Sequence, residues 1–243
     1  MQIQKFFSLA IIATFALSSA FLTSCEKEEA TEPAISGEEA AELLEVSLKA
    51  DSEGLAAEMM LAAELAQSAV NKNLTTLDCG ETRDSTVSHS IANAWVTANY
   101  SSTFTWGLIC NNFDIPTQLT FTRETAGDYE SNRWISDDEA SSNWIVSQLL
   151  TGDSWVVNGS YERLGYQESK VHEMRTFNST ITYQVTDLHI SKDDRRISSG
   201  ATSFSLAGEN SDGNSFLITG GLVFNGDGTA TLTINGESYL IEL

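Results

Sequence analysis

Two hydrophobic periodicities follow one another along most of the chain. Over residues 36–73 the apolar residues recur at helical spacing, and over residues 74–243 they alternate with polar residues in short runs. Helical spacing gives a helix one apolar stripe, whereas alternation gives a strand one apolar face. The pattern predicts an α+β fold, in which one or two N-terminal helices pack on a large, curved, mostly antiparallel β-sheet, a meander of about 9–11 strands.

A capping box marks the start of the helical segment. Ser36 precedes Glu39 by three positions, so each side chain can bond to the backbone amide of the other residue. We expect Asp51 or Ser52 to cap a second helix that ends near Val70. The residues expected to fill the core beneath these helices are Leu43, Leu44, Val46, Leu48, Leu55, Met59, Met60, Leu61 and Leu65.

The region after residue 74 carries both strand and turn signals. Ile181, Tyr183 and Val185 share one face of a strand whose other face is polar, which is the pattern of a sheet with one solvated side. Asn225-Gly226-Asp227-Gly228 and Asn235-Gly236 are hairpin sequences, because Asn and Gly accept positive φ. The clearest strand candidates are residues 117–123, 142–150, 155–163, 170–177, 180–191, 197–206, 215–224, 229–234 and 238–242.

The N-terminus has the features of a secretory signal peptide. Lys5 supplies a positive charge, and Phe6 to Leu22 form an apolar run that is interrupted by a few Ser and Thr residues. A membrane-spanning helix is the alternative, but the run is at the short edge of the roughly 20 residues that a span needs. We interpret residues 1–24 as a signal peptide and the Glu-rich residues 25–35 as a flexible tether.

Leu22-Thr23-Ser24-Cys25 resembles the lipobox of bacterial lipoproteins, in which the Cys thiol receives a diacylglycerol. The resemblance implies that Cys25 is lipidated, and each CH₂ group buried in the membrane contributes about 0.8 kcal/mol to attachment. Lys27-Glu28-Glu29 resembles the tag that exports Bacteroidota lipoproteins to the outer face of the outer membrane. An ordinary solvated linker is the alternative for this run, and the periplasmic leaflet is the alternative location. We expect an outer-membrane lipoprotein that faces the cell surface.

The charge balance bears on partners. The chain has 13 Lys and Arg against 34 Asp and Glu, a formal net charge of −21. A surface this negative repels phosphate groups, so nucleic acid is not an expected partner and flat contact with an anionic membrane is unfavourable.

Two cysteines remain once Cys25 is assigned to lipidation. Cys79 and Cys110 form an even pair in an oxidising compartment, and we expect a disulfide between them. The bond would close a loop of about 31 residues and stabilise the fold by roughly 3–4 kcal/mol. A two-Cys metal site would need His ligands nearby, and His89 is alone between the cysteines. We therefore expect no metal site and no cofactor.

Three stretches carry a second resemblance. They are Trp106-Gly107-Leu108-Ile109-Cys110, Val157-Asn158-Gly159-Ser160-Tyr161 and the C-terminal Asn-Gly hairpins. Over roughly residues 77–243 the chain is similar to a family of uncharacterised Bacteroidota surface lipoproteins. The resemblance implies a β-rich ectodomain and assigns no activity to any residue.

The sequence lacks the common catalytic motifs. It contains no Gly-x-Ser-x-Gly, no Gly-rich phosphate loop and no His-Glu-x-x-His. Two well-placed carboxylates would suffice for a glycosidase, but we interpret Asp137-Asp138-Glu139 and Asp193-Asp194 as solvated turns. Asp212-Gly213-Asn214 offers oxygen ligands for calcium but is shorter than a full calcium loop. We expect no catalytic residue.

Two further kinds of site are candidates. Asp84-Ser85-Thr86 is similar to the O-glycosylation site of Bacteroidota proteins, and we expect Ser85 in a loop. Exposed tryptophans on a sheet can stack on sugar rings, although burial in the core is the alternative for each. The candidates for stacking on a ligand are Trp95, Trp106, Trp134, Trp144 and Trp155.

These features predict a lipid-anchored cell-envelope protein with a non-enzymatic binding or structural role, with glycan binding as one candidate. A carrier of an apolar ligand such as lipid, enclosed between helices and sheet, is the first alternative, and a carboxylate-dependent glycan hydrolase is the second. A row of exposed tryptophans would favour glycan binding, and a sealed apolar cavity would favour lipid. Two carboxylates about 5–10 Å apart in a cleft would favour hydrolysis.

Overall fold

The computed structural model describes residues 33–71, 77–172 and 174–243. The predicted signal peptide, Cys25 and the Lys27-Glu28-Glu29 tag lie outside these residues. Pro33–Leu243 forms one compact unit, and the buried hydrophobic cluster that begins at Ile35 lies within it. The helices and the sheet therefore share one core.

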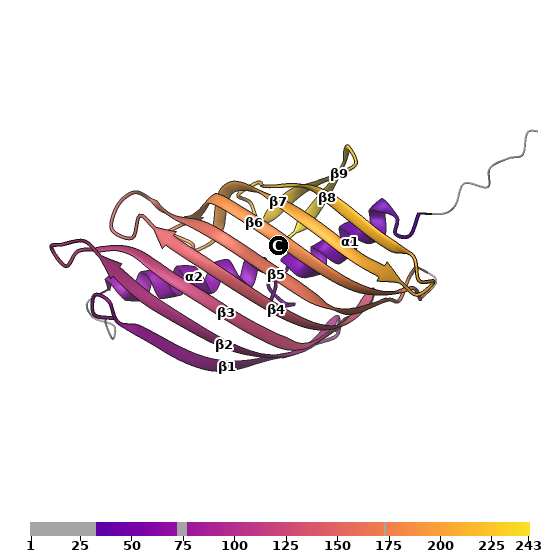
Figure 1. Cartoon of the computed structure of the whole chain (residues 1–243), viewed down its shortest axis with the longest axis horizontal. Helices are drawn as coiled ribbons and strands as arrows, with labels where there is room; N and C mark the ends of the chain where they lie inside the picture. Colours follow the sequence, from indigo (N-terminus) through magenta and orange to yellow (C-terminus); the bar gives the residue numbers. More distant parts are fainter. Residues whose placement is uncertain (1–32, 72–76, 173) are drawn as a thin grey trace, which may run out of the picture. The chain divides into compact units, whose positions relative to one another are not determined.

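Ten antiparallel strands form one sheet, and each strand pairs with its neighbours in the chain (Figure 1). This order confirms the predicted meander, in which successive hairpins build the sheet. Because the direction alternates, the turns that follow even-numbered strands lie at one end of the sheet, and those that follow odd-numbered strands lie at the other. The strands are β1 (Thr82–Ala92), β2 (Val96–Cys110), β3 (Pro116–Ser131), β4 (Trp134–Ser147), β5 (Ser154–Ser169), β6 (Thr176–Ser191), β7 (Ile197–Asn210), β8 (Ser215–Phe224), β9 (Thr229–Ile234) and β10 (Glu237–Glu242).

In the part of the chain that the structure describes, two helices precede the sheet, α1 (Gly37–Leu48) and α2 (Leu55–Val70). The capping box at α1 is confirmed: the Glu39 amide donates to Ser36 Oγ at 3.1 Å, and the Ser36 amide donates to Glu39 Oε2 at 2.9 Å. The predicted cap of the second helix is wrong, because Gly54 occupies the N-cap without a side-chain hydrogen bond. Ser52 is buried instead, and its hydroxyl donates to the carbonyl oxygens of Val46 and Lys49.

A close backbone approach explains the glycine at the start of α2. A Cβ atom at Gly54 would lie 2.4 Å from the carbonyl oxygen of Ser47. The chain therefore turns back tightly between the helices, and a larger residue would push them apart.

Both helices lie against one face of the sheet (Figure 1). α1 packs near β9 and β10, and α2 packs against β3 and β4. The helices bury Leu43, Leu44 and Leu48 of α1 and Leu55 and Met59 of α2. The sheet face beneath them buries Phe121, Trp144, Tyr161, Ile181, Tyr183 and Val185. The opposite face is predominantly solvated, as the alternation predicts.

Several strand assignments need correction. Of the predicted strand 170–177, residues 170–172 and 174–175 lie in the β5–β6 connection, beside which the Ser169 amide donates to the Arg175 carbonyl at 2.9 Å. Strands β1 and β2 are rich in Ser and Thr, and they lie outside the strand candidates predicted from the sequence, which begin at residue 117. Asp137-Asp138-Glu139 lies within β4 and not in a turn, and Asp138 is buried. Asp193-Asp194 does lie in a turn, between β6 and β7.

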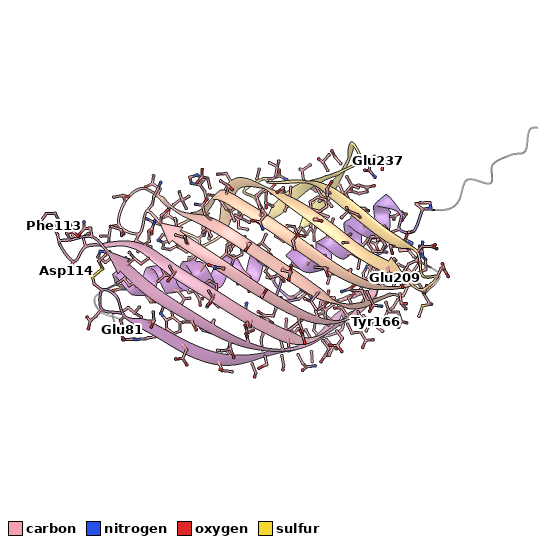
Figure 2. All side chains as sticks on the ribbon, viewed as in Figure 1. Glu81, Phe113, Asp114, Tyr166, Glu209 and Glu237 are labelled. Atoms are coloured by element: carbon pink, nitrogen blue, oxygen red, sulfur yellow. A yellow bond between two sulfur atoms is a disulfide. The ribbon has the colours of Figure 1, made fainter. Side chains whose placement is uncertain are left out.

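The predicted disulfide is present between Cys79 and Cys110. It joins the segment before β1 to the end of β2, close to the labelled Glu81 and Asp114 in Figure 2. The Gly80 amide donates to the Leu108 carbonyl at 2.8 Å and continues the pairing beside the bond. None of the helices in the described ranges is long and apolar enough to cross a membrane.

Candidate functional site

A cleft of about 590 Å³ separates α2 from one end of the sheet. The sheet side consists of the β6–β7 turn (residues 192–196), the β8–β9 turn (residues 225–228) and the end of β10. These segments meet because each follows an even-numbered strand of the meander. The volume is within the range of pockets that bind small molecules, about 300–1,000 Å³.

Apolar side chains from both sides form the walls of this cleft. Ala56, Met59 and Met60 line it from α2, and Ile197 and Leu243 line it from the sheet. The helical spacing of the α2 residues, with four positions from Ala56 to Met60, places them on one helix face. Both sides of the cleft therefore contribute apolar side chains.

The two methionines of the pair have different environments. Met59 is 1% exposed, which confirms it as a core residue, whereas Met60 is 51% exposed, so its predicted burial is wrong. A methionine side chain is flexible and polarisable, and it adapts to apolar ligands of different shape. Met60 is therefore the adaptable apolar group of the cleft.

Charged side chains also line the cleft. Arg195 Nη1 lies 3.9 Å from Glu64 Oε1, which links the β6–β7 turn to α2. Both side chains are at least half exposed, so this ion pair contributes little to stability. The other charged residues that line the cleft are Asp194, Arg196, Asp227 and Glu242.

Hydrogen bonds hold the two aspartates of the cleft in their ionised form. The Thr229 hydroxyl and amide donate to Asp227 Oδ1, and they lower the pKa of this carboxyl. Hydrogen bonds from Ser191 and the Arg196 amide lower the pKa of Asp194 in the same way. A glycosidase needs a general acid whose pKa is raised, so these two carboxyls do not match that role.

A buried ion cluster fastens α2 to the sheet, separately from the cleft. Arg123 on β3 donates to Glu58 Oε1 at 3.2 Å, to Glu53 Oε2, and to Ser102 Oγ at 2.7 Å. Glu53 also contacts His89 Nδ1 on β1. Arg123 and both glutamates are buried, so the cluster replaces water with reciprocal hydrogen bonds.

Glu58 is the carboxyl of this cluster with a shifted pKa. Burial raises the pKa, and the Arg123 charge opposes the rise. Its Oε2 accepts hydrogen bonds from Ser142 Oγ at 2.6 Å and Trp144 Nε1 at 3.1 Å. Glu58 is 1% exposed and surrounded by these donors, so no substrate can approach it in this conformation.

A second buried pair lies beside the first cluster. Arg163 on β5 donates to Asp138 Oδ2, to Tyr100 Oη at 2.9 Å and to the Ser52 carbonyl at 2.7 Å. Gln167 donates to the other Asp138 oxygen at 2.9 Å. The arrangement holds the connection between the helices against the middle of the sheet.

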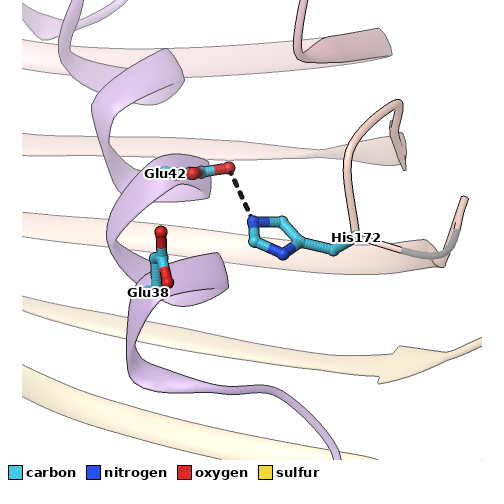
Figure 3. A group of neighbouring side chains, drawn as sticks. All are labelled: Glu38, Glu42 and His172. Atoms are coloured by element: carbon cyan, nitrogen blue, oxygen red, sulfur yellow. Dashed lines mark ion pairs between the residues drawn. The ribbon is translucent and has the colours of Figure 1, made fainter.

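Glu38, Glu42 and His172 form a third group, shown in Figure 3. Each offers a ligand atom, these atoms lie within 4.8 Å of one another, and His172 Nε2 lies 3.3 Å from Glu42 Oε2. Glu42 is already engaged, because Arg133 binds its Oε1 and Trp134 Nε1 donates to its Oε2 at 3.0 Å. A cation would have to compete with Arg133 for this carboxylate, so we interpret the group as a link between α1 and two hairpins.

The tryptophans do not form a stacking platform. Trp134, Trp144 and Trp155 are buried, because they lie on the sheet face that the helices cover or at its margin, and their assignment to ligand stacking is corrected to the core. Trp106 is partly buried, and its ring centroid lies 5.3 Å from the ring centroid of Phe104. Trp95 is 71% exposed, in the β1–β2 turn.

The structure places the O-glycosylation candidate differently from the sequence expectation. Ser85 lies within the edge strand β1, where it pairs with Phe104 of β2, and not in a loop. The hydrophobic pattern of the sequence does not point to Arg123, to Arg163 or to the charged residues that line the cleft.

Comparisons with protein-family models, curated proteins and solved structures find no significant match to this chain.

Proposed function

We propose that the protein is a lipid-anchored envelope protein whose ectodomain binds a small molecule with an apolar portion, without chemical conversion. The observation that carries the proposal is the cleft between α2 and the sheet, with its exposed Met60. This function corresponds to the apolar-ligand carrier considered from the sequence, except that the proposed site is an open cleft and not a sealed cavity. Pockets of this size with apolar walls and a few polar groups are the usual form of small-molecule sites.

The rest of the covered sheet face supports this location. Leucines of α1 and α2 and aromatic side chains of the sheet fill the space beneath the helices. The burial of three tryptophans removes the main support for glycan binding on the sheet. The cleft combines an accessible opening with apolar walls, which an apolar ligand needs.

Filling the cleft should weaken binding of an apolar probe. We expect the unit Pro33–Leu243 to bind N-phenylnaphthylamine with a rise in fluorescence, and we expect Met60→Trp to weaken binding roughly tenfold or more by occupying the cleft. Gln67→Trp is the matched control, since it adds the same indole to an exposed position of α2 that does not line the cleft. Equal binding of the probe by the wild type and both variants would contradict the proposed site. Failure of the wild-type protein to bind the probe would also contradict it.

Membrane attachment is proposed to depend on Cys25. The acyl chains proposed on Cys25 would anchor the protein in the membrane. We therefore expect the Cys25→Ala variant, which cannot carry them, to leave the membrane fraction. Fractionation of cells that express either form tests this, and retention of the variant in the membrane would contradict lipidation. Protease treatment of intact cells separately tests surface exposure, since an ectodomain on the periplasmic side would remain protected.

A further inference from the structure

We infer that the molecule bound in the cleft is a cationic amphiphile, with its positive group at the mouth and its apolar part between α2 and the sheet. This inference rests on the proposed function and specifies the ligand class. It depends on the charges that line the cleft together with the apolar walls.

Negative groups outnumber positive groups at the cleft. Among the residues that the structure describes, four side-chain carboxylates and two guanidinium groups line it, which gives a local net charge of −2 at neutral pH. The whole chain adds to the same sign, with a formal net charge of −21. An anionic head group would therefore meet a repulsive potential, and a cationic one an attractive potential.

The two guanidinium groups are not free of acidic neighbours. Arg195 is paired with Glu64 across the mouth. Arg196 lies two positions after Asp194, and its positive charge contributes to the lowered pKa of the Asp194 carboxyl. Each arginine is thus offset by a nearby carboxylate, and Asp227 and Glu242 remain as the excess negative charge.

Geometry separates the polar and apolar parts of the site. Glu64 and Glu242 are exposed on opposite sides of the cleft, one on α2 and one on β10. Met59 and Ile197 are buried in its walls. A ligand with one cationic end and an apolar tail matches this arrangement, because the tail gains burial while the charge stays in contact with water.

The test compares three amphiphiles with the same dodecyl chain. Dodecyltrimethylammonium, dodecyl sulfate and dodecyl maltoside, each below its micelle concentration, compete for N-phenylnaphthylamine bound to the unit Pro33–Leu243. We expect the cationic compound to displace the probe at a concentration roughly tenfold lower than the anionic one, with the neutral compound between them. Raising the salt concentration should reduce this difference, because the charges are exposed.

Paired variants distinguish the cleft from the general negative charge. Glu64→Gln with Glu242→Gln should weaken binding of the cationic compound about three- to tenfold and strengthen binding of the sulfate. Glu124→Gln with Glu162→Gln removes the same charge from exposed positions outside the cleft and should leave the ranking unchanged.

The outcomes separate the two claims. If the probe does not bind, or no amphiphile displaces it, the proposed function fails. If all three compounds displace it equally, or the sulfate displaces it best, an apolar site exists but the inferred ligand class is wrong. An equal effect of the two variant pairs would also overturn the inference, because it would show attraction to the overall charge.

Discussion

Replacing Arg123 by methionine is expected to lower the free energy of unfolding by about 3–5 kcal/mol. The substitution keeps an apolar chain in place but leaves Glu53 and Glu58 buried without their shared cation. The hydrogen bonds that remain to Glu58, from Ser142 and Trp144, carry no positive charge, so they do not offset the cost of its lost hydration as Arg123 does. The loss should therefore far exceed that of one surface ion pair.

The Arg123→Met defect should also depend on pH. Burial already raises the pKa of Glu58, and loss of the Arg123 charge removes the main opposing effect. A carboxyl with a raised pKa in the folded state stabilises the fold at low pH, and this contribution is lost as the pH rises through that pKa. The variant should thus recover part of its lost stability as the pH is lowered from neutral toward the ordinary glutamate pKa of about 4.3.

Urea unfolding followed by circular dichroism measures both effects. Arg195→Met is the control, because it removes an exposed arginine whose pair with Glu64 is long, and we expect a loss below about 1 kcal/mol. A loss for Arg123→Met as small as that of the control would contradict a structural role for the buried cluster.

Alkaline pH is expected to unfold the protein cooperatively as buried tyrosines ionise. Burial raises the pKa of Tyr161 to about 12 and raises the pKa values of Tyr100 and Tyr183 further. In the unfolded chain a tyrosine ionises near pH 10, so this stabilisation is complete below about pH 10 and is lost as the pH rises through the folded pKa. Between about pH 10 and 12, Tyr161 alone should remove about 2–3 kcal/mol, and the other two add to this loss.

Phenolate absorbance and circular dichroism, recorded together during a pH titration, test this expectation. The buried tyrosines should ionise in the same step in which the β-sheet signal disappears. Tyr161→Phe should move that step to higher pH, whereas Tyr166→Phe, at an exposed position, should not. Ionisation of all tyrosines near pH 10 with the sheet intact would contradict their burial.

The main features of the fold follow from local patterns in the sequence. The capping box at Ser36 fixes the start of α1, and the alternation in residues 180–190 identifies the covered and solvated faces of β6. Hairpin sequences such as Asn225-Gly226 predict sequential pairing. These signals depend on neighbours in the chain, which is why they are accessible without a structure.

The buried ion clusters depend on contacts between residues that are distant in the sequence. The hydrophobic pattern therefore does not predict them. Arg123 has the same strand parity as Leu119 and Phe121, and Arg163 the same parity as Tyr161. A charged residue at a core-facing position of a strand was the available signal that a partner would cover it. The identity of that partner, Glu58 on α2, is set by how the helices lie on the sheet.

The acidic run in β4 shows the same limitation. Asp137-Asp138-Glu139 has the composition of a turn, but pairing with β3 and β5 makes it part of the sheet. The Arg163 guanidinium then compensates the buried Asp138. The sequence does not predict the cleft either, because its walls come from α2 and from turns that are far apart in the chain.

The methionine methyl groups report directly on whether an amphiphile binds between α2 and the sheet. In the unit Pro33–Leu243 the methionines are Met59, Met60 and Met174. Met174 is 55% exposed, close to the 51% of Met60, but it lies in the β5–β6 turn at the opposite end of β6 from the cleft. In methyl NMR spectra with added dodecyltrimethylammonium, we expect saturable shifts of the Met59 and Met60 signals and none of Met174. Equal shifts of Met60 and Met174, or no shift of Met60, would contradict binding in the cleft.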